Sequence, residues 1–132
     1  MSNPFPLPYV EHECRKLGMT LDQYLSEVVA AYIEAIYFTE QEGEDLPPMD
    51  DQSVRLIEAE CYAFLHLARW HVIDWLPKQI GHDFWLTRNG HGSGFWDRDC
   101  GTPASRDALT LLAQRFDIQD WYVGDNAILH AS

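Results

Sequence analysis

The segment from Gly81 to Cys100, GHDFWLTRNGHGSGFWDRDC, constrains the fold of this chain more than any other. Its aromatic side chains and histidines surround closely spaced glycines. An Asn-Gly pair between aromatic and β-branched residues is a strong hairpin signal, because both residues tolerate positive φ angles. The segment therefore predicts two strands, His82–Arg88 and Gly94–Arg98, joined by a tight turn over Asn89–Ser93.

Apolar periodicity predicts helices in the first half of the chain. A short helix is expected over Tyr9–Leu17, where a glycine follows and ends it. A long helix begins after Thr20, because Thr20 and Gln23 fit a capping box. A second long helix is expected over Ser53–Ala68, after an acidic loop that contains proline and glycine.

The second half is predicted to mix helix and strand. Trp70–Leu76 is interpreted as an extension of the preceding helix or a separate short helix, interrupted at Pro77. Beyond the hairpin, the residues Thr102–Phe116 form a helix with a threonine cap and a proline in its first turn. Asp120–Val123 and Ala127–His130 then form a strand pair, or one strand and a return.

Together these elements predict an α+β fold, in which N-terminal helices pack on a small antiparallel β-sheet. The C-terminal half would have the order β-β-α-β(-β), with Trp85, Phe95, Trp121 and Val123 in the core. A chain of 132 residues suits a single domain. Its expected parts are a proline-rich arm with a short helix (1–19), a helical part with an acidic loop at 40–51 (20–80), and a hairpin–helix–strand part (81–132).

Charge is distributed unevenly along the chain. Nine basic and 21 acidic residues give a net charge of −12. Residues 1–60 hold 13 acidic and three basic residues, a net of −10, whereas residues 61–132 hold eight and six, a net of −2. An acidic half repels nucleic-acid phosphates and attracts basic protein surfaces or metal ions, so direct nucleic-acid binding is disfavoured.

The acidic loop supplies the candidate partner-binding residues. Six carboxylates lie in or beside it, and a solvated connector without a binding role would have the same composition. These residues are Glu40, Glu42, Glu44, Asp45, Asp50 and Asp51.

The remaining sequence features favour the cytoplasm. Cys14, Cys61 and Cys100 are an odd number, far apart and without CxxC spacing, as expected for reduced thiols. No apolar run is long enough to span a bilayer, and the N-terminus lacks the layout of a signal peptide. No membrane association is predicted.

Histidines and carboxylates in the predicted hairpin are candidate metal ligands. The strongest candidates are His82, His91, Asp97 and Asp99, which could activate water in a metal-dependent hydrolase or nuclease. Alternate residues of a strand point to opposite faces, so these side chains converge only with help from the turn. There is no HExxH or paired-cysteine pattern, and the expectation is therefore no cofactor, with a divalent metal as the alternative.

The same segment offers a second alternative, which is binding of single-stranded nucleic acid. Aromatic rings and guanidinium groups stack on bases, and Trp85, Arg88, Trp96 and Arg98 lie close together in the sequence. The net negative charge opposes this interpretation. Aromatics at alternate strand positions also suit the core of a sheet.

The block HDFWLTRNGHGSGFWDR, with the ending Asp120-Trp121-Tyr122-Val123-Gly124-Asp125, resembles a family of small proteins encoded by tailed bacteriophages and prophages. Members carry a near-identical HDFWLTRNGHG-GFWDR block, then a helix and a D-YVGD ending. The resemblance covers roughly residues 81–126 and implies a phage origin without implying a reaction. The first 60 residues have no counterpart in it.

These observations favour binding over catalysis. The expected function is a phage-encoded acidic accessory protein that binds and inhibits a host nucleic-acid-handling or defence protein, as anti-CRISPR and antirestriction proteins do. Nucleic-acid mimicry would place its carboxylates in a Lys/Arg groove of the host protein, for example a CRISPR-Cas component. The expected location is the cytoplasm of an infected or lysogenic bacterium. The sequence predicts no oligomeric state.

Overall fold

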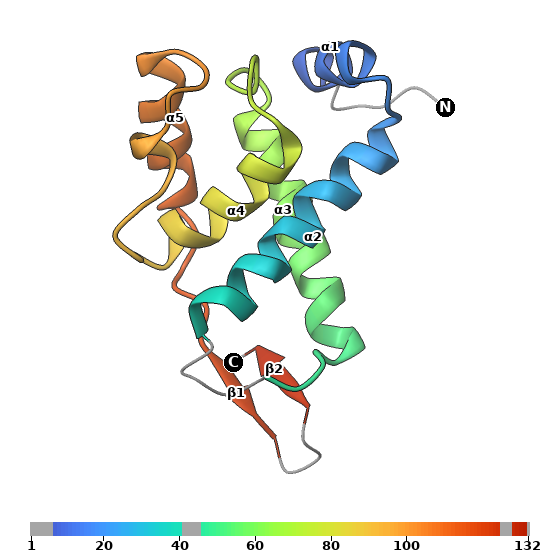
Figure 1. Ribbon diagram of the computed structural model, residues 1–132, viewed down its shortest axis with the longest axis vertical. Helices are drawn as coiled ribbons and strands as arrows, with labels where there is room; N and C mark the ends of the chain where they lie inside the picture. Colours follow the sequence, from blue (N-terminus) through green and yellow to red (C-terminus); the bar gives the residue numbers. More distant parts are fainter. Residues whose placement is uncertain (1–6, 41–45, 125–127, 132) are drawn as a thin grey trace.

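The computed structural model describes residues 7–40, 46–124 and 128–131, and within these residues the protein is mostly helical (Figure 1). The predicted α+β fold is wrong, because the strands of this part of the chain form one two-stranded antiparallel pair. The elements in chain order are α1 (Pro8–Leu17), α2 (Leu21–Glu40), α3 (Asp51–Ala68), α4 (Pro77–Arg88), the 3-10 helix η1 (Phe95–Asp97), α5 (Pro103–Ala113), β1 (Trp121–Val123) and β2 (Leu129–Ala131).

The helices predicted from apolar periodicity are confirmed in α1, α2 and α3. The capping box before α2 is also present. The Gln23 amide N–H donates to Thr20 Oγ1 at 3.1 Å, and the Thr20 amide N–H donates to Gln23 Oε1 at 2.8 Å. Thr102 caps α5 as predicted, and together with Ser105 it forms a second capping box. Capping depends on neighbours in the sequence, so these starts can be predicted locally.

The predicted hairpin is wrong, because residues 82–88 belong to α4 and Phe95 begins a 3-10 turn. Pro77 occupies the first turn of α4, a position that suits proline since its missing N–H has no helical partner there. Ile80 and Phe84 follow at helical spacing, and both are fully buried. A short apolar run fits either a strand or a helix, and tertiary packing decides between them.

The helix predicted over Trp70–Leu76 is also wrong. These residues form turns, and Asp74 has a positive φ of 66°. The turns place Trp75 in the core, where its indole Nε1–H donates to Ser105 Oγ at 3.2 Å. The segment thus connects α3 to α4 and carries one of the largest buried side chains.

Helix α2 crosses both α3 and α4 (Figure 1), and its interface with α4 is the most extensive in the fold. The two helices are in close contact at Gly81, where an added Cβ would lie 2.0 Å from the carbonyl oxygen of Val28. Only a glycine fits at this crossing without moving the backbone. Helix α5 packs against α3 and α4.

Aromatic rings form the centre of the core. Phe64 of α3 stacks on Phe84 of α4 with ring centroids 4.2 Å apart, and Phe95 lies 5.7 Å from Phe64. Among the predicted core residues, Trp85 and Phe95 are buried, whereas Val123 is 53% exposed. Val123 lies in the small strand pair, which has no larger sheet to cover it.

The strand pair lies at the end of the molecule opposite α1 (Figure 1). Trp121 pairs with Ala131 and Val123 with Leu129. The Leu129 amide N–H donates to the Pro48 carbonyl at 2.9 Å, so the strand pair is joined to the segment that precedes α3. Residues 1–6 of the proline-rich arm, residues 41–45 of the acidic loop and residues 125–127 between the strands lie outside the described residues.

Candidate functional site

The large aromatic side chains of the segment Gly81–Cys100 lie mostly in the core and not on the surface. Phe84, Trp85 and Phe95 are fully buried, and Trp96 is 42% exposed. The Trp85 indole Nε1–H donates to Thr39 Oγ1 at 2.7 Å, which joins α4 to α2. Most of the aromatic residues in this segment therefore stabilise the fold.

A buried ion pair connects the two ends of the segment. Asp83 has no exposed surface, and Arg98 binds its carboxylate through Nε at 2.9 Å and Nη2 at 2.6 Å. Gln79 Nε2 donates to the same carboxylate at 2.7 Å. The hydrogen bonds to Asp83 raise the pKa of Arg98. This bidentate pair fixes the loop after α4 against the helix.

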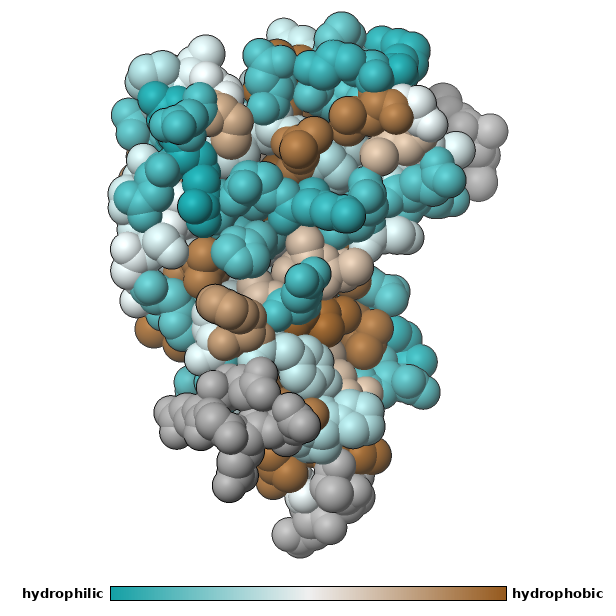
Figure 2. Space-filling view, in the orientation of Figure 1, coloured by the Kyte–Doolittle hydropathy of each residue, from teal (hydrophilic) through white to brown (hydrophobic). Residues whose placement is uncertain are grey.

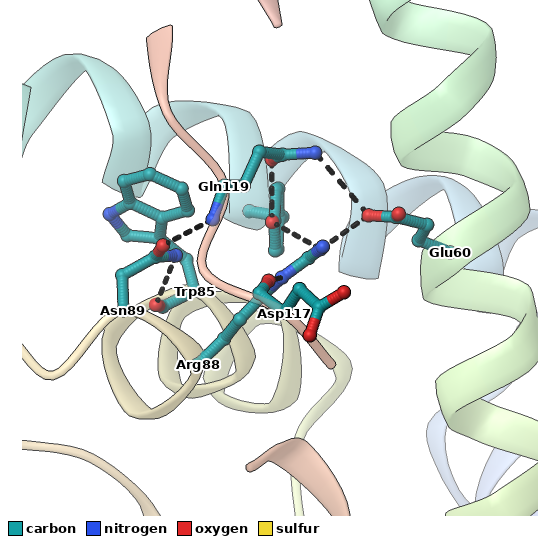
Figure 3. Close-up of polar contacts among 7 residues, drawn as sticks. Glu60, Trp85, Arg88, Asn89, Asp117 and Gln119 are labelled. Carbon is teal, nitrogen blue, oxygen red and sulfur yellow. Dashed lines mark hydrogen bonds and ion pairs between the residues drawn. The ribbon is translucent and has the colours of Figure 1, made fainter. Parts of the chain in front are cut away.

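Arg88 is the centre of a second polar network (Figure 3). Its Nε donates to the Asp117 carbonyl at 2.7 Å, and its Nη1 donates to the Tyr32 hydroxyl at 3.1 Å. Nη1 also forms an ion pair with Glu60 of α3. Burial alone would lower the pKa of Arg88, but the hydrogen bonds to Glu60 and Tyr32 raise it. The guanidinium therefore stays charged inside the protein.

Asn89 and Gln119 extend this network to the chain that follows α5 (Figure 3). The Gln119 amide N–H donates to Asn89 Oδ1 at 2.8 Å, and Asn89 Nδ2 donates to the Trp85 carbonyl at 3.1 Å. The Tyr32 hydroxyl donates to Gln119 Oε1 at 2.8 Å. The polar groups satisfy one another, as a stable buried network requires.

Gly94 explains part of the glycine spacing that the sequence shows. The Phe95 amide N–H donates to Thr87 Oγ1 at 3.2 Å. A Cβ on Gly94 would lie 2.2 Å from the same hydroxyl oxygen. Gly94 therefore permits a close approach of the loop to α4. It does not form the hairpin turn that the sequence predicted.

The predicted metal ligands do not converge. His91 Nε2 lies 3.8 Å from Glu40 Oε1, and His82 Nδ1 lies 3.5 Å from Asp83 Oδ1. The other two candidates, Asp97 and Asp99, are exposed. Within the described residues no group of three or more His, Cys, Asp or Glu side chains could hold a metal ion.

The predicted nucleic-acid residues are likewise separated. Trp85 and Arg88 are buried, so neither can stack on a base in this conformation. Arg98 is engaged by Asp83, and Trp96 is the most accessible of the four. Binding of single-stranded nucleic acid stays a prediction, with one accessible ring to support it.

A groove beside the buried ion pair contains the best candidate for acid–base chemistry. Its lining includes Glu27 and Glu34 of α2 with Lys78, His82 and Arg98. The His82 imidazole next to the Asp83 carboxylate resembles the base and orienting group of many hydrolases. No serine, cysteine or threonine is among the described residues of the lining. The geometry of the groove therefore specifies no reaction.

The predicted acidic loop is only partly described. Glu40 lies at the end of α2 beside His91, and Asp50 and Asp51 lie at the start of α3. His130 Nδ1 is 3.4 Å from Asp50 Oδ1. The candidates outside the described residues are Glu42, Glu44 and Asp45.

A second groove runs between α2 and α3, and we call it the α2–α3 groove. Leu25, Val29 and Ile33 contribute apolar surface to it, and Asp22 and Glu58 contribute carboxylates. No lysine or arginine lines it among the residues the structure describes. Figure 2 shows hydrophobic surface between hydrophilic side chains near the centre of this face, where α2 crosses α3. Sequence periodicity does not reveal this groove, because its lining comes from two helices.

The comparisons with known proteins add no family. Neither a protein-family model, nor a curated protein, nor a solved structure matches this chain. No helix in the described ranges has the length and apolar character needed to cross a membrane. Function must therefore be inferred from the surface of the molecule.

Proposed function

We propose that this protein binds a basic surface of another protein through the α2–α3 groove. The observation that supports this most is the combination of an apolar floor with carboxylates and no cation in the described lining. An apolar floor provides burial on binding, and charged rims select a partner of opposite charge. A cationic, amphipathic segment has the matching chemistry.

The proposed partner is a nucleic-acid-handling or defence protein of a bacterial host. Such proteins carry Lys/Arg grooves for phosphates, and a dense acidic surface competes for them. Glu40, Asp50 and Asp51, at the opposite end of α2 and α3 from Asp22, would extend the contact. The net charge of −12 and the resemblance to phage proteins support this proposal. On this proposal the protein acts in the cytoplasm of an infected or lysogenic cell.

The test has two steps. First, the partner is captured from a bacterial lysate at low salt and identified by mass spectrometry. Second, the purified partner is loaded with a fluorescent oligonucleotide, and the protein is added as a competitor. Displacement is expected at low salt and should weaken as salt is raised, because exposed charges are screened.

Paired variants locate the contact. Asp22→Asn with Glu58→Gln removes two carboxylates from the groove, each worth roughly 0.2–1 kcal/mol, so competition should weaken by about 2- to 30-fold. Glu11→Gln with Asp107→Asn changes the net charge equally at exposed positions elsewhere and should leave competition unchanged. Equal effects of the two variants would contradict the α2–α3 groove as the binding site.

A further inference from the structure

Asp22 and Glu58 lie towards opposite ends of the α2–α3 groove. Asp22 is in the first turn of α2. Glu58 is in the first half of α3, and α3 begins beside the end of α2, where the Tyr37 hydroxyl donates to the Pro47 carbonyl at 2.7 Å. The two helices therefore run in broadly opposite directions, with the end of α2 and the start of α3 towards the same end of the molecule (Figure 1).

Arg88 shows which residues of the two helices lie at the same level. Its Nη1 binds both the Tyr32 hydroxyl of α2 and the Glu60 carboxylate of α3. Glu58 is closer than Glu60 to the start of α3, so it lies level with Tyr32 or beyond it. About ten residues of α2 thus separate the level of Glu58 from Asp22, which is roughly 15 Å at ~1.5 Å per residue.

Apolar side chains line the groove between the two carboxylates. Leu25, Val29 and Ile33 follow one another at four-residue spacing, so they lie on one side of α2. Leu25 and Ile33 are only partly buried against the core, and a partner can cover the rest of their apolar surface. The matching occupant is apolar over about two helical turns and carries a cation towards each end.

The two carboxylates are available to such cations. Within the described residues no ion pair joins Asp22 or Glu58 to a basic side chain. The arginines of α3 near Glu58 in the sequence belong to other contacts. Arg55 lines a separate hollow, and Arg69 Nη1 donates to the His66 carbonyl.

The walls of the groove favour a helical occupant over an extended one. An extended segment leaves its backbone N–H and C=O groups unpaired unless the surface that it covers offers partners. Beyond the first turn of α2, the lining residues lie within α2 and α3, whose backbone groups bond inside their own helices. A helical segment satisfies its own backbone and packs its side chains between the ridges of the two helices.

We propose that the partner segment in the α2–α3 groove is a basic amphipathic α-helix. One face of it carries Lys or Arg at position i, apolar residues at i+4 and i+7, and Lys or Arg at i+11. These positions lie on one side of a helix and place the two cations roughly 16 Å apart, close to the separation of Asp22 and Glu58 along α2. This inference rests on the proposed function and adds the conformation and residue spacing of the partner.

Fluorescence anisotropy with three labelled synthetic peptides tests the proposal. The first carries arginine at i and i+11 and leucine at i+4 and i+7, in a background of alanine and glutamine. The second has the same composition with its leucines on the opposite face. The third has the pattern of the first with a central proline, which breaks the helix. The first peptide is expected to bind at least about 10-fold more tightly than the others, because it alone presents both leucines from one helical face.

Paired protein variants place the peptide in the groove. Asp22→Asn with Glu58→Gln should weaken binding of the first peptide by about 2- to 30-fold, since two carboxylates are lost. Glu11→Gln with Asp107→Asn makes the same change of net charge elsewhere and should leave the affinity unchanged. Circular dichroism checks that both variants are folded and should show helix gained by the first peptide on binding.

The outcomes separate this inference from the proposed function. Equal affinity of the first and third peptides would overturn the helical occupant alone, because an extended basic segment would then fit the groove. Equal affinity of the first and second would overturn it as well, since charge without an apolar face would be sufficient. Absence of binding by the first peptide would also overturn it, and the oligonucleotide competition then decides separately on the proposed function. Binding that the Asp22 and Glu58 substitutions leave unchanged would contradict both, because the groove would not be the site.

Discussion

Asp83 illustrates how polar residues of this chain specify its fold. A carboxylate without exposed surface is stable only when charged and hydrogen-bonded partners surround it, and Arg98, Gln79 and His82 do so. Arg88 has the same role in the network with Glu60. Residues that suggest catalysis when read in sequence are here used to hold α4 and its following loop in place.

Replacing Asp83 by asparagine should destabilise the protein strongly. The substitution keeps the shape but leaves the Arg98 guanidinium without its counter-ion, and breaking a buried pair typically costs about 3–5 kcal/mol. Because the Arg98 side chain is 27% exposed, the lower end, about 3 kcal/mol, is expected. Urea unfolding measures the change. Asp97→Asn, at an exposed neighbour, should stay within about 0.5 kcal/mol of the native protein, and a similar value for Asp83→Asn would contradict a stabilising ion pair.

At the scale of elements, α4 is the decisive case. Phe84, Trp85 and Leu86 form a short apolar run that also fits a strand, whereas Ile80 and Phe84 repeat at helical spacing. The position of Pro77 is the local signal for a helix start. The crossing of α4 with α2 then requires Gly81, because the Val28 carbonyl occupies the space of a side chain. The packing of α4 against α2 therefore determines that this segment is a helix.

Gly81→Ala separates packing from helix propensity. Alanine is favoured over glycine inside a helix by roughly 1 kcal/mol, so propensity alone predicts a more stable protein. Overpacking against backbone typically costs about 1–3 kcal/mol, and here the backbone must move, so a net loss of stability is expected. Thermal and urea unfolding show whether Gly81→Ala lowers or raises the free energy of unfolding. Ser26→Ala, on the exposed side of α2, serves as the control and should be neutral or slightly stabilising. A Gly81→Ala protein more stable than the native protein would show that the helices are less closely packed at this crossing than described.

At the scale of the whole molecule, the net charge of −12 sets the balance of long-range forces. Like charges repel in the folded state, whereas buried pairs such as Asp83–Arg98 are screened little by salt. Moderate sodium chloride should therefore raise the melting temperature. Relief of about 1 kcal/mol corresponds to a rise of ~3–5 °C for a chain of this size.

Differential scanning calorimetry from low to moderate ionic strength checks this expectation. The Asp22→Asn and Glu58→Gln double variant carries less charge and should respond less to salt. A melting temperature that falls as salt increases would mean that exposed ion pairs, such as Lys16 with Asp74, contribute more than repulsion does.

The candidate surfaces also belong to the whole molecule. The α2–α3 groove joins Asp22 of one helix to Glu58 of another. The groove cannot be predicted from one segment, because its lining comes from two helices. The acidic loop is a candidate on composition, and of its six candidate carboxylates Glu40, Asp50 and Asp51 have a described position.

The sequence by itself determined the approximate positions of α1, α2 and α3 and the beginning of α5, since caps and apolar periodicity act between close neighbours. It also determined the acidic character of the first half. Tertiary structure alone decided that the segment Gly81–Cys100 is a helix with a folded-back loop. The reason is physical, because Asp83 meets Arg98, and Arg88 meets Glu60, only after distant elements have packed. The helical arrangement is the one in which both of these ion pairs form.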